Sequence, residues 1–380
     1  MIYLDYAATT PISNEALEAY TSVSRKYYGN SSSLHDYGSS AEQILKASAK
    51  AIAQTMGART KDIHFTSGAS EGSFLAIYSL LNALNKPGKH IITTEIEHSS
   101  VHNIFNRLQE EGYEVSKIPV GADTRIDRQA LNDIIREDTV LASIQYVNSE
   151  TGTIQDLAEI GAFLQKKGIL VHTDAVQAYG KIPLQAEELN VDAISVSAHK
   201  IYGPKGTGAV WIHPNTLWKP VFPGEMAADK LKPGTSDIPS VAAFATAAKH
   251  THQNIDQQQQ QIEQFRTTFL NQLDETGISY SVEGHPRQRV PHILGLRFPG
   301  MEGQFFMLEC NQAGLAISTG SACQVGSEQP NSTMLATGKS GQEAREFVRL
   351  SFGKYNQAEQ IPEIIGKMNT ILKRHYQKSK

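Results

Sequence analysis

The chain of 380 residues contains 40% hydrophobic and 19% charged residues, which indicates a globular protein of about two domains. The net charge of −4, with Lys and Arg scattered along the chain, gives no reason to expect nucleic acid as a direct ligand. Two cysteines, Cys310 and Cys323, exclude a disulfide scaffold and leave no metal-ligand spacing. Neither a signal peptide at residues 1–5 nor a membrane-spanning apolar run is predicted, so we expect a cytoplasmic protein.

Short apolar or β-branched runs alternate with longer amphipathic stretches between Gly57 and Ile212. The predicted strands are 63–65, 90–93, 114–118, 141–146, 169–173, 193–197 and 209–212. The clearest predicted helices between them are 71–85, 100–111, 128–136 and 160–167. Strands that alternate with helices favour an α/β domain with a mostly parallel sheet.

The end of the chain has a different pattern, which predicts a smaller α+β unit. We expect one long helical stretch over 241–275. Its glutamine run, 257–261, is interpreted as a solvated face because Ile262, Phe265 and Phe269 keep a helical spacing. The other predicted elements are strands near 280–282, 293–298, 316–318 and 347–352, and helices over 303–313 and from 358.

The most informative motif is Ser-Ala-His-Lys at residues 197–200, which follows a predicted strand and precedes a glycine-rich turn. Asp174 follows the predicted strand 169–173, and Gln177 lies three residues further on. Pyridoxal phosphate (PLP) needs a lysine for its Schiff base and an acid that keeps its ring nitrogen protonated. Lys200 and Asp174 at the ends of two strands therefore predict a PLP enzyme.

Residues 65–71 run from a strand through small residues into a helix, where backbone N–H groups bind anions. Ser70 and Ser197 add hydroxyl donors. The alternative is that Ser70 simply caps the helix. Beside a lysine that binds PLP, we favour a phosphate site.

His98 follows a strand, where a histidine could stack over an aromatic cofactor and transfer protons near neutral pH. The remaining histidines apart from His199 are expected to be structural, including His35, His90 and His172.

Cys323 lies among small polar residues in a predicted loop, whereas Cys310 lies in an apolar pattern typical of a buried, inert thiol. Because an exposed thiol in a loop is reactive, we predict that Cys323 is a nucleophile. Arg349 lies inside an apolar strand, where an unpaired guanidinium is costly to bury. A bidentate carboxylate, such as that of a substrate, would offset this cost.

Together these motifs resemble the cysteine desulfurases, the NifS/IscS-like branch of the class V (fold type I) aminotransferases. The resembling segments are 3–11, 28–30, 65–71, 97–98, 147–148, 174–177, 197–204, 234–235, 321–323 and 349–351. The resemblance implies the α/β PLP-dependent transferase fold type I. It also implies a large PLP-binding domain over 15–250, and a small α+β domain over 1–14 and 251–380 that carries the cysteine loop.

The activity that the resemblance implies is removal of sulfur from L-cysteine, giving L-alanine and a persulfide on Cys323 that passes to an acceptor protein. Lys200 would bind PLP and take the α-proton, Asp174 would hold the ring nitrogen, and His98 would stack on the ring. The other implied contacts are Gln177 and Ser149 to the ring side of the cofactor, Ala69, Ser70, Ser197 and His199 to its phosphate, and Arg349 and Asn30 to the substrate. Thr235 would reach the phosphate from a partner subunit, which implies a homodimer.

Some positions depart from the family's pattern. Ser149 stands where the family has an asparagine that contacts the cofactor, and residues 223–233 lack the family's glycine-rich loop with arginine. The long loop after Cys323 favours sulfur delivery to Fe–S cluster assembly, tRNA thiolation or thiamine synthesis. The alternatives are a selenocysteine lyase or another class V PLP aminotransferase, and a non-catalytic scaffold. The presence of Lys200 and Asp174 disfavours the scaffold.

Overall fold

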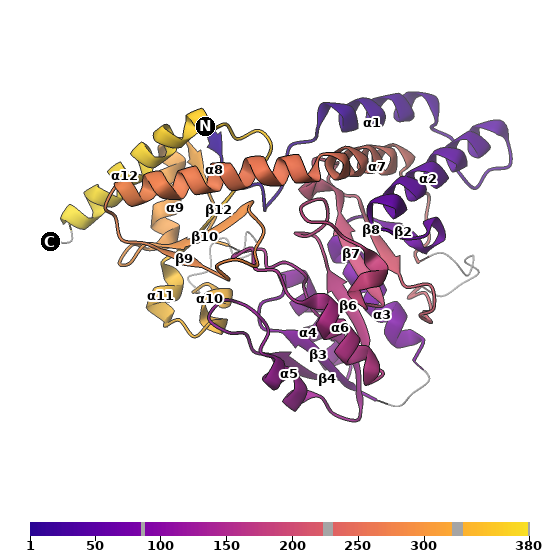
Figure 1. Ribbon diagram of the computed structural model, residues 1–380. Coiled ribbons are helices and arrows are strands. Elements are labelled where there is room, and N and C mark those ends of the chain that lie inside the picture. Colours follow the sequence, from indigo (N-terminus) through magenta and orange to yellow (C-terminus); the bar gives the residue numbers. More distant parts are fainter. Residues whose placement is uncertain (85–87, 223–230, 321–329, 379–380) are drawn as a thin grey trace.

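The computed structural model describes residues 1–84, 88–222, 231–320 and 330–378. Within them, a seven-stranded sheet in the order β2-β8-β7-β6-β5-β3-β4 forms the centre of the larger part (Figure 1). Its strands are β2 (Ile63–Thr66), β3 (His90–Thr94), β4 (Glu114–Ile118), β5 (Thr139–Ser143), β6 (Leu170–Asp174), β7 (Ala193–Ser197) and β8 (Gly208–Ile212). β3 to β7 pair in parallel, and β8 is antiparallel to both of its neighbours. The predicted α/β fold with a mostly parallel sheet is confirmed.

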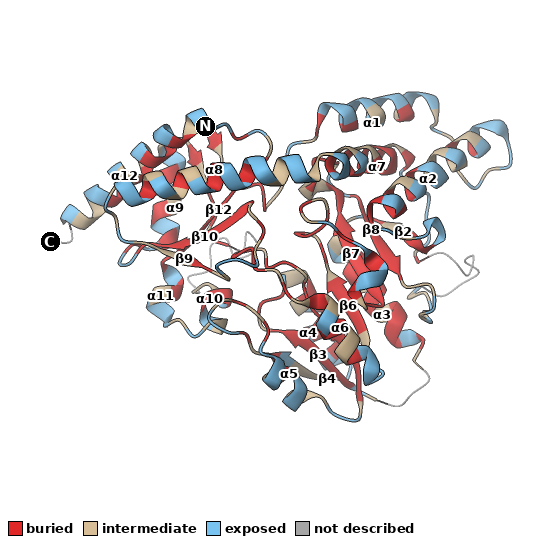
Figure 2. Cartoon of the chain, viewed as in Figure 1, coloured by how far each residue is buried: buried red, intermediate tan, exposed pale blue. Residues whose placement is uncertain are grey.

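Four helices connect the strands as the alternation predicts. They are α3 (Ala69–Asn82), α4 (Ser99–Glu110), α5 (Arg128–Ile134) and α6 (Leu157–Lys166). They cover the sheet with apolar faces, so β3, β5, β7 and β8 are buried on both sides, whereas the edge strand β4 is mostly exposed or half-buried (Figure 2). This burial explains why the inner strands are mainly apolar rather than alternating.

Two helices near the start of the chain were not predicted, α1 (Asn14–Lys26) and α2 (Asp36–Thr55). Both have side-chain N-caps: the Ser13 hydroxyl accepts from the Ala16 N–H, and the His35 ring accepts from the Gly38 N–H. Both pack against α7 (Ile238–Gln253), which is far away in sequence.

The predicted single helical stretch over 241–275 is wrong in one respect, because the structure has two helices there. α7 ends and α8 (Ile255–Glu275) begins at Asn254, whose side-chain amide donates to the His250 carbonyl at 2.7 Å. This bond competes with the helical ladder and interrupts it. Most side chains of the glutamine run 257–261 are exposed, as predicted, whereas Phe269 is fully buried.

The second core lies in the smaller part of the molecule and combines both ends of the chain. Leu4 packs there with Phe269, Phe306 and Phe352. Its further elements are β1 (Ile2–Tyr3), β9 (Ser281–Glu283), β10 (Ile293–Arg297), α9 (Gly303–Gln312), β11 (Leu315–Ala316), α10 (Ser332–Ala336), α11 (Gly341–Arg345), β12 (Phe347–Ser351) and α12 (Ile361–Lys378). The domain boundaries at 14/15 and 250/251 stay a prediction, which these separate cores support.

Two predicted strands differ from the structure. β5 ends at Ser143, because the Gln145 backbone N–H leaves the ladder and donates to the Glu97 carboxylate. β11 ends at Ala316, and Ser318 instead forms an isolated bridge with Arg349. Among the described residues, no helix is both long and apolar enough to cross a lipid bilayer.

Candidate active site

A cavity of about 510 Å³ lies at the carboxyl ends of the central strands, which is where open α/β sheets bind ligands. Asp174 is the last residue of β6, Ser197 is the last residue of the adjacent β7, and Lys200 closes the single 3-10 turn that follows. The predicted site residues that line the cavity are Ala69, Ser70, His98, Ser149, Asp174, Gln177, Ser197, His199, Lys200 and Arg349.

Three other predicted site residues remain, of which only two lie in the described part of the chain. Cys323 lies outside the described residues. Gly320 and Thr333, on either side of the segment that contains it, both line the cavity. Thr235 and Asn30 are exposed, and neither lines the cavity of this single chain.

The Lys200 side chain reaches the cavity through contacts with the N-terminal segment. Its Nζ donates to the carbonyls of Ala7 at 2.6 Å and Ala8 at 2.7 Å. The Gln177 side-chain amide also donates to the Ala7 carbonyl, at 2.9 Å. The lysine and the glutamine are therefore held by the same short stretch of backbone.

Asp174 is a buried carboxylate whose negative charge is stabilised by few groups of the protein. Burial raises its pKa, while the charge of His98, the Val176 N–H and Lys200 lower it. The Val176 N–H donates to Oδ1 at 2.9 Å. A protonated ring nitrogen in the cavity would compensate the buried charge and hold this carboxylate ionised.

The opposite end of the cavity is built for an anion. Gly68 is the N-cap of α3, with φ of +134°, and a Cβ there would meet no atom of the described residues within 4 Å. Open space therefore lies in front of the helix N-terminus, whose N–H groups attract anions. The alternative in which Ser70 caps the helix is wrong, because α3 begins at Ala69 and Ser70 lies in its first turn.

His98 is the N-cap of α4, and its Nδ1 accepts the Ser100 backbone N–H at 3.2 Å. The loss of surrounding water lowers the pKa of His98, as does Lys200, while Asp174 opposes this. A neutral ring with an unprotonated Nδ1 carries its proton on Nε2. By contrast, His90 and His172 each have both ring nitrogens hydrogen-bonded in the buried sheet, as expected of structural histidines.

Arg349 has a carboxylate partner, as expected, and this partner belongs to the protein itself. Its Nη2 lies 2.8 Å from the Asp5 carboxylate, and its Nη1 donates to the Ser149 carbonyl at 2.9 Å. Its buried Nε has no partner among the described residues. Arg349 therefore keeps a donor that a substrate carboxylate would satisfy.

Several titratable residues of the cavity wall were missed at the sequence level: Glu97, His102, Glu150 and Lys205. His102 lies four residues after His98 on α4, a spacing that places both on one face of a helix. That spacing was the available signal for His102. Glu150 could be recognised as a cavity residue only from the fold, because its contacts are with Gly320 and Asn331, which lie far along the chain.

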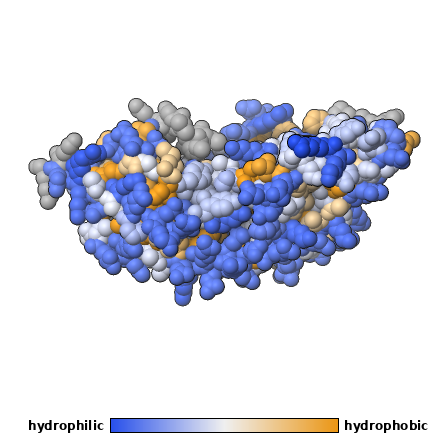
Figure 3. All heavy atoms as spheres, turned by 90° about the horizontal axis from the view of Figure 1, so that it is seen from above, coloured by the Kyte–Doolittle hydropathy of each residue, from blue (hydrophilic) through white to orange (hydrophobic). Residues whose placement is uncertain are grey.

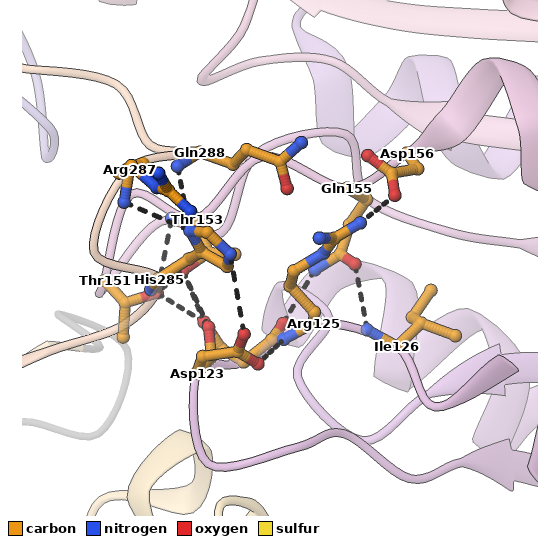
Figure 4. A network of polar contacts seen from close by, with 11 residues as sticks. Asp123, Arg125, Ile126, Thr151, Thr153, Gln155, Asp156, His285, Arg287 and Gln288 are labelled. Atoms are coloured by element: carbon orange, nitrogen blue, oxygen red, sulfur yellow. Dashed lines mark hydrogen bonds and ion pairs between the residues drawn. The ribbon is translucent and has the colours of Figure 1, made fainter.

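A network of polar contacts anchors the turn that carries residues 149–150 (Figure 4). The hydroxyls of Thr124, Thr151 and Thr153 lie within 3.2 Å of one another. The His285 backbone N–H, from the segment that leads into the second core, donates to the Thr153 hydroxyl at 2.9 Å. The network therefore fixes this part of the cavity wall from two sides.

Glu97 is a strongly perturbed acid of the wall. Its Oε1 accepts from the Gln145 N–H at 2.7 Å and the Thr94 hydroxyl at 2.8 Å, while its buried Oε2 has no partner among the described residues. Burial, and to a smaller extent the charge of Asp174, raises the pKa of Glu97 to about 8, although the two hydrogen-bond donors lower it. Glu97 is therefore mainly protonated at neutral pH.

We expect Glu97→Gln to remove a pH dependence of stability. Because the folded-state pKa of about 8 exceeds the ordinary value of 4.5, the folded protein keeps a proton that the unfolded chain releases between these two pH values. The wild-type free energy of unfolding should fall relative to that of the variant across this window, by at most about 1.4 kcal/mol per pH unit. Urea unfolding of both proteins at about pH 5.5 and about pH 8 measures this. If the free energies of unfolding of wild type and variant differed by the same amount at both pH values, Glu97 would not be protonated in the folded protein.

Comparison with known proteins places this site in a family. The model named Aminotransferase class-V matches residues 2–364. A NifS-type relative from Bacillus subtilis (strain 168) is 45% identical over 367 residues, which are 96% of this chain and 93% of the relative. Cysteine desulfurase IscS 1 of Archaeoglobus fulgidus is 33% identical over 376 residues, which are 98% and 97% of the two chains. The solved structure of a NifS-like protein superposes with a TM-score of 0.90 at 29% identity, and covers 98% of this chain and 99% of its own.

The sheet, the lysine and the acid define the class, which is that of PLP-dependent enzymes of fold type I. Within it, the chain belongs to the class-V aminotransferases, in the NifS/IscS-like cysteine desulfurase branch. The predicted family, fold and cofactor are confirmed.

The described residues fit PLP. The open space before Gly68 suits a phosphate, the partly uncompensated Asp174 suits a ring nitrogen, and Lys200 lies beside both. Gly208 makes this approach possible, because a Cβ on it would lie 2.8 Å from the Gly68 Cα. Any larger residue at position 208 would push β8 away from the phosphate end.

Proposed function

We propose that this enzyme removes sulfur from L-cysteine, releasing L-alanine and leaving a persulfide on Cys323 for an acceptor protein. One observation carries the proposal. A single cavity brings Lys200, Asp174 and Arg349 together with residues from both sides of the segment that contains Cys323. A transaminase would need the lysine and the acid, but it has no use for a thiol delivered to the same cavity.

In this mechanism, bound PLP supplies an electron sink. Lys200 would bind the cofactor and move the proton at the substrate α-carbon, and Asp174 would hold the ring nitrogen charged. Arg349 would bind the substrate carboxylate, which fixes the side-chain sulfur toward the thiol. His98, neutral with its proton on Nε2, would stack on the ring and exchange protons with the substrate.

The Cys323 thiolate would then attack the substrate sulfur. A new S–S bond forms as the C–S bond breaks, and the electron pair of that bond stays with the substrate carbon, which takes up a proton to become the methyl group of alanine. The remaining contacts stay as predicted: Gln177 and Ser149 to the ring side, Asn30 to the substrate, and Ala69, Ser70, Ser197 and His199 to the phosphate.

A homodimer is part of the proposal, with Thr235 of one copy reaching the phosphate of the other. The region of α1, α2 and Asn30 carries exposed apolar side chains, which are Leu17, Tyr20, Tyr28, Leu34 and Tyr37. Seen from the side of α1 and α8, the surface is otherwise mainly hydrophilic, with separate hydrophobic areas (Figure 3). Apolar side chains around the predicted site residue Asn30 suit a surface that a second copy covers.

The acceptor and the pathway are open among Fe–S cluster assembly, tRNA thiolation and thiamine synthesis. A cytoplasmic location also stays a prediction.

The test of the activity is incubation of the PLP-loaded enzyme with L-cysteine and a reductant. Alanine and sulfide should appear in equal amounts. If wild type forms no alanine even with candidate acceptors added, the proposed activity is wrong, and turnover of L-selenocysteine alone would favour a selenocysteine lyase.

We expect Asp174→Asn to lower kcat by about a hundredfold while the enzyme still binds PLP. The amide keeps the size and the acceptor oxygen for the Val176 N–H, but it loses the charge that holds the ring nitrogen protonated. Alanine formation and the absorbance of bound PLP measure the two effects separately. A variant with wild-type kcat would show that Asp174 does not act on the ring nitrogen.

A further inference from the structure

We propose that residues 5–10 are the positioning element of this site, in which Asp5 orients Arg349 at the substrate end and Thr9 orients His199 at the phosphate end. The inference rests on the proposed function, which assigns those two ends. It concerns residues that touch neither substrate nor cofactor in that scheme and act through other side chains.

Asp5 is the direct partner of the substrate-binding guanidinium. Its Oδ1 lies 2.8 Å from Arg349 Nη2, and the Arg349 side chain is 4% exposed. The Ser149 carbonyl accepts from Nη1 at 2.9 Å. With both terminal nitrogens bonded, the guanidinium plane cannot rotate freely, and the unpartnered Nε keeps one orientation in the cavity wall. Asp5 therefore holds the Arg349 guanidinium in the orientation that binds a carboxylate before the substrate enters the cavity.

Thr9 acts in the same way on His199. The Thr9 hydroxyl lies 3.1 Å from His199 Nδ1, and the Thr9 carbonyl is itself held by the Tyr3 hydroxyl at 3.0 Å. Burial lowers the pKa of His199 to about 4, with Lys200 and Lys205 adding to the effect, so the ring is neutral. A hydroxyl that donates to Nδ1 leaves the ring proton on Nε2, where it can serve a phosphate oxygen.

The middle of the segment connects the two ends. The Ala7 and Ala8 carbonyls accept from Lys200 Nζ, and the Thr10 N–H and hydroxyl both donate to the His199 carbonyl at 2.9 Å. The Ala7 N–H donates to the buried Ser351 hydroxyl at 2.8 Å. The segment is therefore fixed to the second core while it contacts lysine, histidine and arginine of the site.

Two pairs of variants separate positioning from general stability. Asp5→Ala removes the partner of Arg349, whereas Asp5→Asn keeps an acceptor oxygen in place. Thr9→Val removes the hydroxyl at nearly constant shape, whereas Thr9→Ser keeps it. The control is Ser13→Ala, which removes the N-cap of α1 just after the segment and does not touch the site.

The measurements are the KM and kcat for L-cysteine at saturating PLP, and the dissociation constant of PLP added back to the cofactor-free protein. We expect Asp5→Ala to raise the KM about tenfold or more with kcat and PLP affinity little changed, and Asp5→Asn to recover part of the loss. Thr9→Val should raise the PLP dissociation constant about fivefold without changing the KM, and Thr9→Ser should match wild type. Ser13→Ala should lower the unfolding midpoint and leave both constants unchanged.

The inference is overturned if Asp5→Ala and Thr9→Val change the KM and the PLP affinity together, as a general loosening would, or if neither constant moves. These outcomes are distinct from failure of the proposed function. If the proposed function fails, the wild-type enzyme itself forms no alanine, and the PLP titration still tests the role of Thr9.

Discussion

Replacement of Cys323 with alanine should abolish the release of sulfide and alanine from L-cysteine, with a loss of at least about a thousandfold in kcat. The proposed reaction needs a thiolate as the acceptor of the substrate sulfur, and no water molecule or hydroxyl replaces a thiolate in forming an S–S bond. PLP binding should be unaffected, because none of the proposed cofactor contacts involves Cys323. The absorbance of bound PLP and the amounts of alanine and sulfide measure both points.

The chain offers a matched control in its second cysteine. Cys310 is fully buried in α9, and burial raises the pKa of its thiol to about 12, so it cannot supply a thiolate at neutral pH. Cys310→Ala should lose some stability through the cavity it creates and keep its sulfide release. If Cys323→Ala turned over L-cysteine at the wild-type rate, the persulfide mechanism would be wrong.

Lys200→Ala should remove both the absorbance band of covalently bound PLP and at least about a thousandfold of kcat. In the proposed mechanism, Lys200 Nζ both binds the cofactor and moves the α-proton, and general acid–base catalysis alone contributes about 10²–10⁴-fold. The Ala7 and Ala8 carbonyls hold this nitrogen at the cavity.

The control for this variant is Lys167→Ala, which removes an exposed lysine just after α6, outside the cavity lining. It should keep both the absorbance band and the activity. A Lys200→Ala protein that retained the absorbance band would show that PLP binds through a different lysine, and it would remove the basis of the proposed site.

The sequence analysis succeeded where the signal is local. Strands buried on both sides leave continuous apolar runs, so the order of β2 to β8 could be predicted along the chain. Lys200 and Asp174 were predicted because each directly follows such a run. The buried state of Cys310 followed from the apolar pattern of its own helix.

It failed where a residue's role depends on a distant partner. The separation of α7 from α8 depends on one side-chain bond of Asn254, which composition does not reveal. A carboxylate partner was expected for Arg349, but nothing local shows that this partner is Asp5, 344 positions earlier, at 2.8 Å. Likewise, nothing in the sequence near residues 5–10 shows that this segment contacts Lys200 and His199.

The sequence by itself therefore determined the alternating α/β fold and the family, and it predicted the chemistry of the lysine, acid and cysteine. Those features depend on local periodicity and on residue type. Only the tertiary structure decided that Gly68 rather than Ser70 is the N-cap of α3, that Glu97 is a buried and mainly protonated acid, and that Asp5 and Thr9 contact Arg349 and His199. Hydrogen bonds and desolvation depend on which atoms meet in space, and parallel strands with long crossovers bring together residues that the chain keeps far apart.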